Sequence, residues 1–338
     1  AMQAFEAREP GFDALFSVLQ GGLVSFRYGS SPLSGRRGVF GGNAAFGGHA
    51  SAGAVELLEK VPRPCFWRTP TSNDAGNHMG ARHGVWKQAE AYQIPRPETL
   101  RIFTDADSVF LQIRHELPVP GAASGSGTGA ASGNIGSPSP AEASPTVTVG
   151  YRFYADGMLA LTLDWEPRPG QPLPPMPVFG FQFRMNADYD RFSWYGRGPA
   201  ENYCDRNRGA RLGVYRSTVW ENLTPYLVPQ ECGNRTGVRW AEVTDGRGRG
   251  IRFMAGDPHR TAWGDRPSME FSALPYTADE LENASHPYEL PPAHYTNVRC
   301  ALMQMGVGGD DSWGAKTLPQ YCLPADRPLH FEMTIQGI

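Results

Sequence analysis

The chain has 338 residues, of which 40% are hydrophobic and 19% charged, and its formal net charge is −3. This charge argues against a nucleic-acid or anionic-membrane partner, and no apolar run reaches the roughly 20 residues needed to span a bilayer. The length allows one large domain or two ordinary ones. The 40 glycines and 30 prolines are typical of a β-rich chain with many turns.

The cysteines are widely scattered and none forms a Cys-x-x-Cys pair, which argues against a zinc knuckle or a thioredoxin motif. They are Cys65, Cys204, Cys232, Cys300 and Cys322. An odd number of separated thiols is simplest to explain in a reducing cytoplasm. The first residues lack the pattern of a signal peptide. We therefore expect a cytoplasmic protein.

Hairpin signals dominate the chain. Three pairs of period-two or apolar segments each enclose a short turn: 15–19 with 23–28, 151–154 with 158–165, and 241–244 with 250–254. Residues 329–335 resemble a last strand. The strongest signal is Asp156-Gly157, because this dipeptide favours the turn of a tight hairpin. After it, Leu159, Leu161 and Leu163 alternate with smaller or polar residues, which predicts a strand with one buried face.

Only one helix start is predicted, at the capping box Thr277-Ala278-Asp279-Glu280, and Pro287 makes that helix short. Few helices and many hairpins predict an all-β chain built as a large antiparallel β-sandwich.

A segment rich in glycine and serine, at about 120–145, has almost no apolar anchors. It buries too little surface to offset its ordering entropy, so we expect it to be flexible or disordered. Because it lies between strand-like 109–115 and 146–154, it is interpreted as an expanded hairpin loop within one domain spanning 1–338. The alternative is a linker between two domains.

A first polar motif runs from Phe66 to Gly76 and ends in the turn formers Asn73, Asp74 and Gly76. A structural loop is the simpler interpretation, and ligand contact is the alternative. His78 and His83 follow, but their spacing with Asp74 does not define a metal site.

Two more polar motifs follow strand-like segments. In 194–206, Glu201, Asp205 and Arg206 are predicted to form an ion-pair network that holds the base of the loop. The Gly-x-Gly within it is no phosphate loop, because no helix with Lys-Ser/Thr follows. In 226–235, acids and arginines are expected to satisfy loop backbone internally.

The segment Met305-Gly306-Val307-Gly308-Gly309-Asp310-Asp311-Ser312-Trp313 is the most informative. Its glycines and acids disfavour a strand or a helix, so Trp313 is presented from an irregular loop. An indole placed in this way suits stacking on the apolar face of a sugar ring. The alternative is a plug that fills the loop.

In this order, four motifs resemble the C-terminal domain of bacterial β-galactosidases of glycoside hydrolase family two, and equally the small subunit of heterodimeric β-galactosidases. They are FWRTPxxNDxG at 66–76, GxGPxENYxDR at 196–206, YxxPQExGNR at 226–235 and GxGGDDSW at 306–313. The resemblance covers the chain from about Gly11 to its end, and the glycine- and serine-rich insert departs from it.

This resemblance implies a single galactose-mutarotase-like sandwich that acts with a catalytic TIM barrel on β-galactosides such as lactose. The two catalytic glutamates and the divalent and monovalent cations are expected in that barrel, so no catalytic residue, metal or other cofactor is assigned to this chain. Trp313 maps onto the tryptophan that contacts the leaving sugar. The loop residues expected near the active site are Gly198, Pro199, Glu201, Asn202, Asp310 and Asp311.

Two other function classes remain open from the sequence. One is a free-standing aldose epimerase, for which His286 and Glu289 are the first base and acid candidates. The other is a carbohydrate-binding module. The barrel is expected either in the same chain, upstream of Met2, or as a separate large subunit; we favour a fragment of a larger enzyme. The coding sequence upstream of Met2 would decide between them.

Overall fold

The computed structural model describes residues 4–9, 12–29, 54–119, 144–262, 267–311 and 314–338. The strands in this part of the chain are β1 (Ala4–Glu9), β2 (Phe12–Ser17), β3 (Gly22–Tyr28), β4 (Val55–Glu56), β5 (Lys60–Cys65), β6 (Ile94–Thr104), β7 (Ser108–Glu116), β8 (Thr146–Tyr154), β9 (Leu159–Trp165), β10 (Val178–Asn186), β11 (Arg191–Gly198), β12 (Arg211–Thr218), β13 (Arg235–Val238), β14 (Trp240–Thr244), β15 (Gly250–Ala255), β16 (Met269–Leu274), β17 (Tyr295–Gln304) and β18 (Leu329–Gly337). The helices are α1 (Ser72–Gly76), α2 (Met79–Ala91), α3 (Ala278–Asn283), and the 3-10 turns η2 (Pro287–Glu289) and η3 (Pro319–Tyr321).

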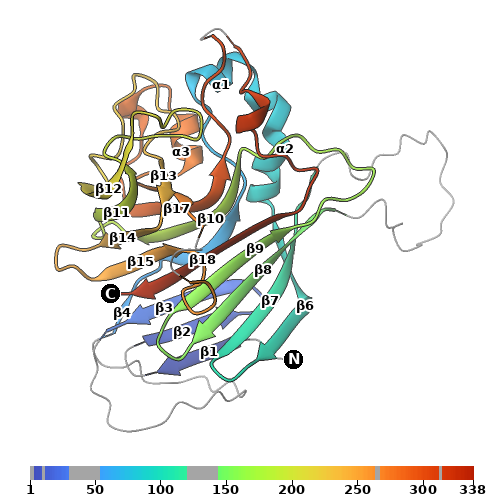
Figure 1. The fold of residues 1–338 in the computed structure, drawn as a ribbon, viewed down its shortest axis with the longest axis vertical. Helices are drawn as coiled ribbons and strands as arrows, with labels where there is room; N and C mark the ends of the chain where they lie inside the picture. Colours follow the sequence, from blue (N-terminus) through green and yellow to red (C-terminus); the bar gives the residue numbers. More distant parts are fainter. Residues whose placement is uncertain (1–3, 10–11, 30–53, 120–143, 263–266, 312–313) are drawn as a thin grey trace, which may run out of the picture.

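The strands form three antiparallel sheets (Figure 1). The largest has the order β12-β11-β14-β15-β18-β9-β8-β7-β6, the second β13-β16-β17-β10-β5 and the third β1-β2-β3-β4. The all-β antiparallel fold predicted from the hairpin signals is therefore confirmed. So are the hairpins β2–β3, β8–β9 and β14–β15, whose strands pair along their length. The last strand, β18, is central, because it pairs with both β15 and β9.

One hydrophobic core joins the sheets. The largest sheet packs on the five-stranded sheet through aromatic pairs such as Phe253 with Phe183, whose ring centroids are 5.2 Å apart. It packs on the four-stranded sheet through Tyr151 and Phe16, also at 5.2 Å. Edge-to-face contacts of this kind add to the burial of apolar area that holds such layers together.

The predicted short helix at Thr277 is confirmed as α3, with both hydrogen bonds of its capping box formed. The expectation that 66–76 ends in a structural loop is wrong for its last residues, which form α1, and α2 was not predicted at all. Helix α2 is stabilised by tertiary packing, because Met79, His83 and Trp86 are buried along one of its faces. Figure 1 shows α1 and α2 together at one end of the molecule, beside the segment that follows β17.

Strands β7 and β8 pair from Ser108–Tyr154 to Glu116–Thr146, so the described residues before and after the glycine- and serine-rich insert belong to neighbouring antiparallel strands. Residues 120–143 of the insert themselves lie outside the described ranges. Within those ranges no helix has the length and apolar character required to cross a membrane.

Candidate functional site

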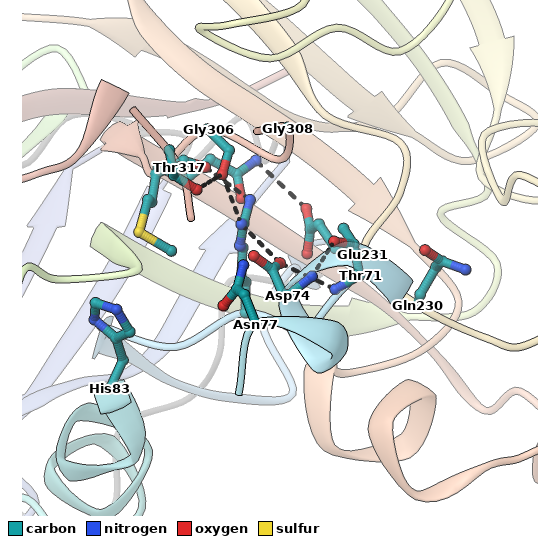
Figure 2. Close-up of polar contacts among 12 residues, drawn as sticks. Thr71, Asp74, Asn77, His83, Gln230, Glu231, Gly306, Gly308 and Thr317 are labelled. Atoms are coloured by element: carbon teal, nitrogen blue, oxygen red, sulfur yellow. Dashed lines mark hydrogen bonds and ion pairs between the residues drawn. The ribbon is translucent and has the colours of Figure 1, made fainter. Parts of the chain in front are cut away.

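The buried guanidinium of Arg68 joins the first polar motif to the glycine-rich segment. Figure 2 shows Asp74 and Gly306, which belong to these two segments, close together. The guanidinium donates to Asp74 Oδ2 at 2.8 Å and to the backbone oxygens of Met305 at 2.7 Å and Gly306 at 3.0 Å. Asp74 is also positioned by its helix, because it forms a capping box with Thr71 at the start of α1. A buried ion pair adds little net stability, because desolvation of the two charges offsets their attraction, but loss of one partner is costly.

The glycine-rich segment also contacts the loop after β11. The amide of Gly308 donates to Asp205 Oδ2 at 2.8 Å. A Cβ added at Gly306 would lie 2.5 Å from the same oxygen, so the close approach requires glycine there. On the other side, Gly314 has φ +109°, and a Cβ there would lie 2.8 Å from the oxygen of Gly76. The backbone on either side of positions 312–313 is thus held against two of the other motifs.

The third motif completes the convergence. Gln230 accepts a hydrogen bond from the amide of Ser72 at 3.0 Å. Asn234 accepts from the amide of Asn202 at 2.8 Å and donates its side-chain amide to the Asn202 oxygen at 3.0 Å. Four motifs that are far apart in the sequence therefore form one cluster at the α1 end of the fold, which we call the motif cluster.

The predicted ion-pair network is wrong for Asp205, which has no ion pair in the described residues and accepts from the amide of Gly308 instead. Arg206 and Glu201 do form an ion pair, at 2.7 Å. Glu201 has the structural role predicted for it. It accepts from Arg206, Thr224, Tyr226 and the amide of Gly233, at 2.7 to 2.9 Å. Burial raises the pKa of Glu201, but these hydrogen bonds outweigh burial and leave its pKa below the ordinary value. A carboxylate with four donors is an anchor for the loop base.

Asn202 is likewise committed to structure. Its buried side-chain amide donates to the backbone oxygens of Arg197 and Ala200, and its oxygen accepts from the amide and hydroxyl of Thr236. All of its side-chain hydrogen-bonding capacity is used within the protein.

The other predicted site residues lie as follows. Gly198 is buried, and a Cβ there would meet Tyr215 and Trp194. Pro199, Asp310 and Asp311 are exposed, and Asp311 accepts from the amide of Ala315 at 3.2 Å. Trp313 lies outside the described residues, so its predicted stacking role stays a prediction.

Several buried polar atoms of the motif cluster have no hydrogen-bond partner in the described part of the chain. They include both side-chain atoms of Asn73, Asp74 Oδ1 and Asp205 Oδ1. Buried polar groups in folded proteins are nearly always satisfied by protein, water or ligand.

The histidines near α1 have structural partners. His83 is buried, with one ring nitrogen 2.9 Å from the oxygen of Pro175 and the other 2.9 Å from Arg82, and burial lowers its pKa. His78 precedes α2 with φ 58°. Across the described residues no group of three or more His, Cys, Asp or Glu side chains is placed to hold a metal ion.

The epimerase candidates His286 and Glu289 are exposed and bond to each other at 3.1 Å in the turn η2. Glu289 also accepts from the amides of Ser285 and His286. The pair is therefore used locally, at the surface.

Sequence reasoning missed a buried ion pair on the face of the five-stranded sheet. Glu231 accepts two hydrogen bonds from Arg299, which lies on β17, and Gln304 lies beside both. The motif was expected to satisfy its own loop. Its acid instead pairs with an arginine 68 residues away, and no local signal reports that contact.

Glu270, on β16 next to this pair, carries a testable pH effect. Burial raises the pKa of its carboxyl to about 7, against an ordinary value of 4.5. Between these values the folded chain holds a proton that the unfolded chain has released, so the free energy of unfolding falls as pH rises from 4.5 to 7. The fall should total roughly 3 kcal/mol.

Glu270→Gln should therefore lack this part of the pH dependence and gain stability relative to wild type between pH 5 and pH 8. Urea unfolding of the wild type and the variant at pH 5 and at pH 8 measures this difference in the free energy of unfolding. The exposed Glu98→Gln is the matched control and should keep the wild-type slope. Parallel slopes for wild type and Glu270→Gln would contradict the assignment.

The family match and the relatives found by sequence indicate one family. The family described as "Beta galactosidase small chain" matches residues 8–335. A β-galactosidase from Priestia megaterium is 40% identical over 84% of this chain and 24% of its own length. One from Halalkalibacterium halodurans is 35% identical over 97% of this chain and 27% of its own length. The chain thus spans about a quarter of the length of these first relatives.

A relative named β-galactosidase small subunit, from Latilactobacillus sakei, is 35% identical over 83% of this chain and 86% of its own length. Among solved structures, a galactose mutarotase-like protein from Lactobacillus casei covers 99% of the chain with a TM-score of 0.44 and 9% identity. That level of likeness says nothing about activity. The match over 8–335, together with the small-subunit relative, shows that this chain belongs to the β-galactosidase small-chain family.

Proposed function

We propose that this chain is the non-catalytic sandwich of a β-galactosidase and that it completes the aglycone side of the active site. Its partner is a catalytic TIM-barrel region of the family-two type, in the same polypeptide or as a large subunit. The substrate is a terminal β-D-galactoside such as lactose. The catalytic glutamates and the cations belong to the barrel.

The observation that carries the proposal is the motif cluster. Arg68, which pairs with Asp74, and Asp205 hold the backbone of 305–308 in place, and Gly314 rests on Gly76, so the described residues on both sides of positions 312–313 are held by the cluster. Aromatic residues that contact sugars need this kind of support, because a site that is loose by about 1 Å loses much of its effect.

The relatives support a divided enzyme. The small subunit of Latilactobacillus sakei is matched over 86% of its length, whereas the relatives named β-galactosidase from Priestia megaterium and Halalkalibacterium halodurans are matched over about a quarter of theirs. A unit that occurs both as part of a long chain and as a named subunit has a partner region elsewhere.

The epimerase alternative has no support from geometry. His286 and Glu289 are exposed and engaged with each other, and the side chain of Tyr288 beside them is 80% exposed. An acid and base that act on a sugar need to meet it in a concave site. The other alternative is a carbohydrate-binding module that acts without a catalytic partner. Tight binding of galactose to the isolated chain, measured by calorimetry, would support it, but we expect little or no binding.

Trp313→Ala in the complete enzyme tests the aglycone role. The Michaelis constant for lactose should rise, and glucose should become a poorer acceptor in transglycosylation. The expected loss of binding free energy for the glucose unit is about 1–2 kcal/mol. Stacking on the leaving sugar acts in the ground state and in the acceptor step, so bond cleavage itself should change little.

The control is a synthetic galactoside with a small leaving group, whose kinetics should change less than those of lactose. Leu19→Ala, at an exposed position in the turn between β2 and β3, serves as the matched surface variant. Equal effects on both substrates, or no effect on either, would return Trp313 to the role of a loop plug.

A further inference from the structure

A cavity of about 360 Å³ lies beside the loop that follows β11. Its walls come from both main sheets, and part of its lining is apolar, from Met269, Leu302 and Met303. The polar part comes from Arg197, Cys204, Asn207, Thr236, Arg239 and Glu270. The aglycone role of the motif cluster does not use this cavity.

Two guanidinium groups converge on this cavity over Gly237. A Cβ built on Gly237 would lie 3.2 Å from Arg239 Nη1 and 3.8 Å from Arg197 Nε. The two nitrogens are therefore separated by no more than the sum of these distances, which is less than the Debye length of about 8 Å at physiological ionic strength. Like charges this close repel each other, and an anion between them offsets this repulsion by attracting both.

Neither guanidinium has a carboxylate partner in the described ranges. Arg197 donates to the backbone oxygen of Ala210 at 3.2 Å, and Arg239 donates to the oxygen of Gly237. Arg239 also lies over the ring of Tyr195, at 5.9 Å from the centroid. Each arginine has five donors, so most of them remain available.

The acidic groups of the cavity leave this charge in place. Glu270 is buried, and the guanidiniums that act most on it are those of Arg299 and Arg68. Its raised pKa also leaves it partly protonated at neutral pH. The thiol of Cys204 is neutral, because burial raises its pKa to about 12.

We propose that this cavity binds a small molecule that carries an oxyanion, with its phosphate or carboxylate between Arg197 and Arg239 and its apolar face on Met269, Leu302 and Met303. Planar guanidiniums are the preferred partners of both anions, since their paired N–H groups match two oxygens at once. The methionine side chains adapt to ligands of different shape.

Titration of the purified chain with inorganic phosphate and with D-galacturonate tests this, at constant ionic strength and with uncharged galactose for comparison. Calorimetry should show binding of at least one anion and none of galactose at the same concentrations. Binding of phosphate alone assigns a phosphorylated ligand to the cavity. Binding of galacturonate alone assigns a carboxylate ligand, and binding of both assigns a general oxyanion site. Arg197→Gln and Arg239→Gln should each weaken the binding of the anion about ten-fold or more.

Arg191→Gln is the matched control, because Arg191 lies on the same strand β11 at its other end and is exposed. Its anion affinity should equal that of the wild type, and thermal unfolding should show that all three variants are folded. Absence of anion binding, or equal losses in Arg191→Gln, would overturn the proposal. So would normal anion binding by Arg197→Gln and Arg239→Gln together with loss of their association with a catalytic chain, which would assign the arginines to a protein interface.

Discussion

Replacing Asp74 by asparagine is expected to lower the free energy of unfolding of the chain by about 3 kcal/mol or more. The side chains of Asp74 and Arg68 are 1% and 0% exposed. Asparagine keeps the size and the hydrogen-bond acceptor that Thr71 uses, but it removes the negative charge. The cation of Arg68 would then remain buried without compensation, which costs more than the ion pair contributes when intact.

Urea unfolding of the two proteins at one pH measures this loss. Asp326→Asn is the control, because Asp326 lies 3.4 Å from Arg327 but the two side chains are 78% and 65% exposed. An exposed pair of this kind contributes about 0–1 kcal/mol. Equal losses of stability in the two variants, or unfolding of Asp74→Asn at the wild-type urea concentration, would show that the buried pair has no such role.

The same variant links stability to the site. Since Arg68 holds the oxygens of Met305 and Gly306, loosening it should displace the backbone that leads to Trp313. In a complete enzyme, Asp74→Asn should therefore raise the Michaelis constant for lactose in the direction expected for Trp313→Ala. A small synthetic galactoside is again the comparison.

The hairpins were predictable because their information is local. Asp156-Gly157 lies between alternating segments, and Gly157 has φ +85°, which glycine adopts without strain. Thr277 and Glu280 lie three residues apart, and that spacing alone defines the start of α3. The same spacing occurs at Thr71 and Asp74, so the start of α1 was within reach of the sequence.

Helix α2 gave a weaker signal. Met79, His83 and Trp86 have helical spacing, but Gly80 and Gly84 interrupt it and His78 supplies no side-chain cap. Tertiary contact decides the outcome: the indole of Trp86 donates to the oxygen of Pro174 at 2.9 Å. Packing of this kind overrides propensity and does not show in a local pattern.

The four motifs could be recognised in the sequence, but the contacts that bring them together could not be predicted from it. Arg68 and Gly306 are 238 residues apart, and no periodicity reports that they meet. Glu231 shows the same limit, because its partner Arg299 lies on a strand that was not predicted. The order of the motifs indicates the family, whereas the contacts depend on the register of β16, β17 and β10, which is set by the core.

Purified without a partner, the chain is expected to leave a chromogenic β-galactoside unhydrolysed. Glycoside hydrolysis requires two carboxyl groups across the bond, about 5–5.5 Å apart when configuration is retained. Several acids of the motif cluster are already occupied: Asp74 by Arg68, Glu201 by its four donors and Glu231 by Arg299. Each would have to give up these contacts to reach a sugar.

Glu270 is the carboxyl that most needs to be tested, because a pKa of about 7 would suit it to act as a general acid. The assay therefore compares the wild-type chain with Glu270→Gln and Glu201→Gln, each at high protein concentration. All three should show only the background rate, and turnover should appear when a catalytic barrel chain is added to the wild type. Turnover by the pure chain that either substitution abolishes would show that the sandwich has its own catalytic carboxylates and would refute its assignment as a non-catalytic part of a β-galactosidase.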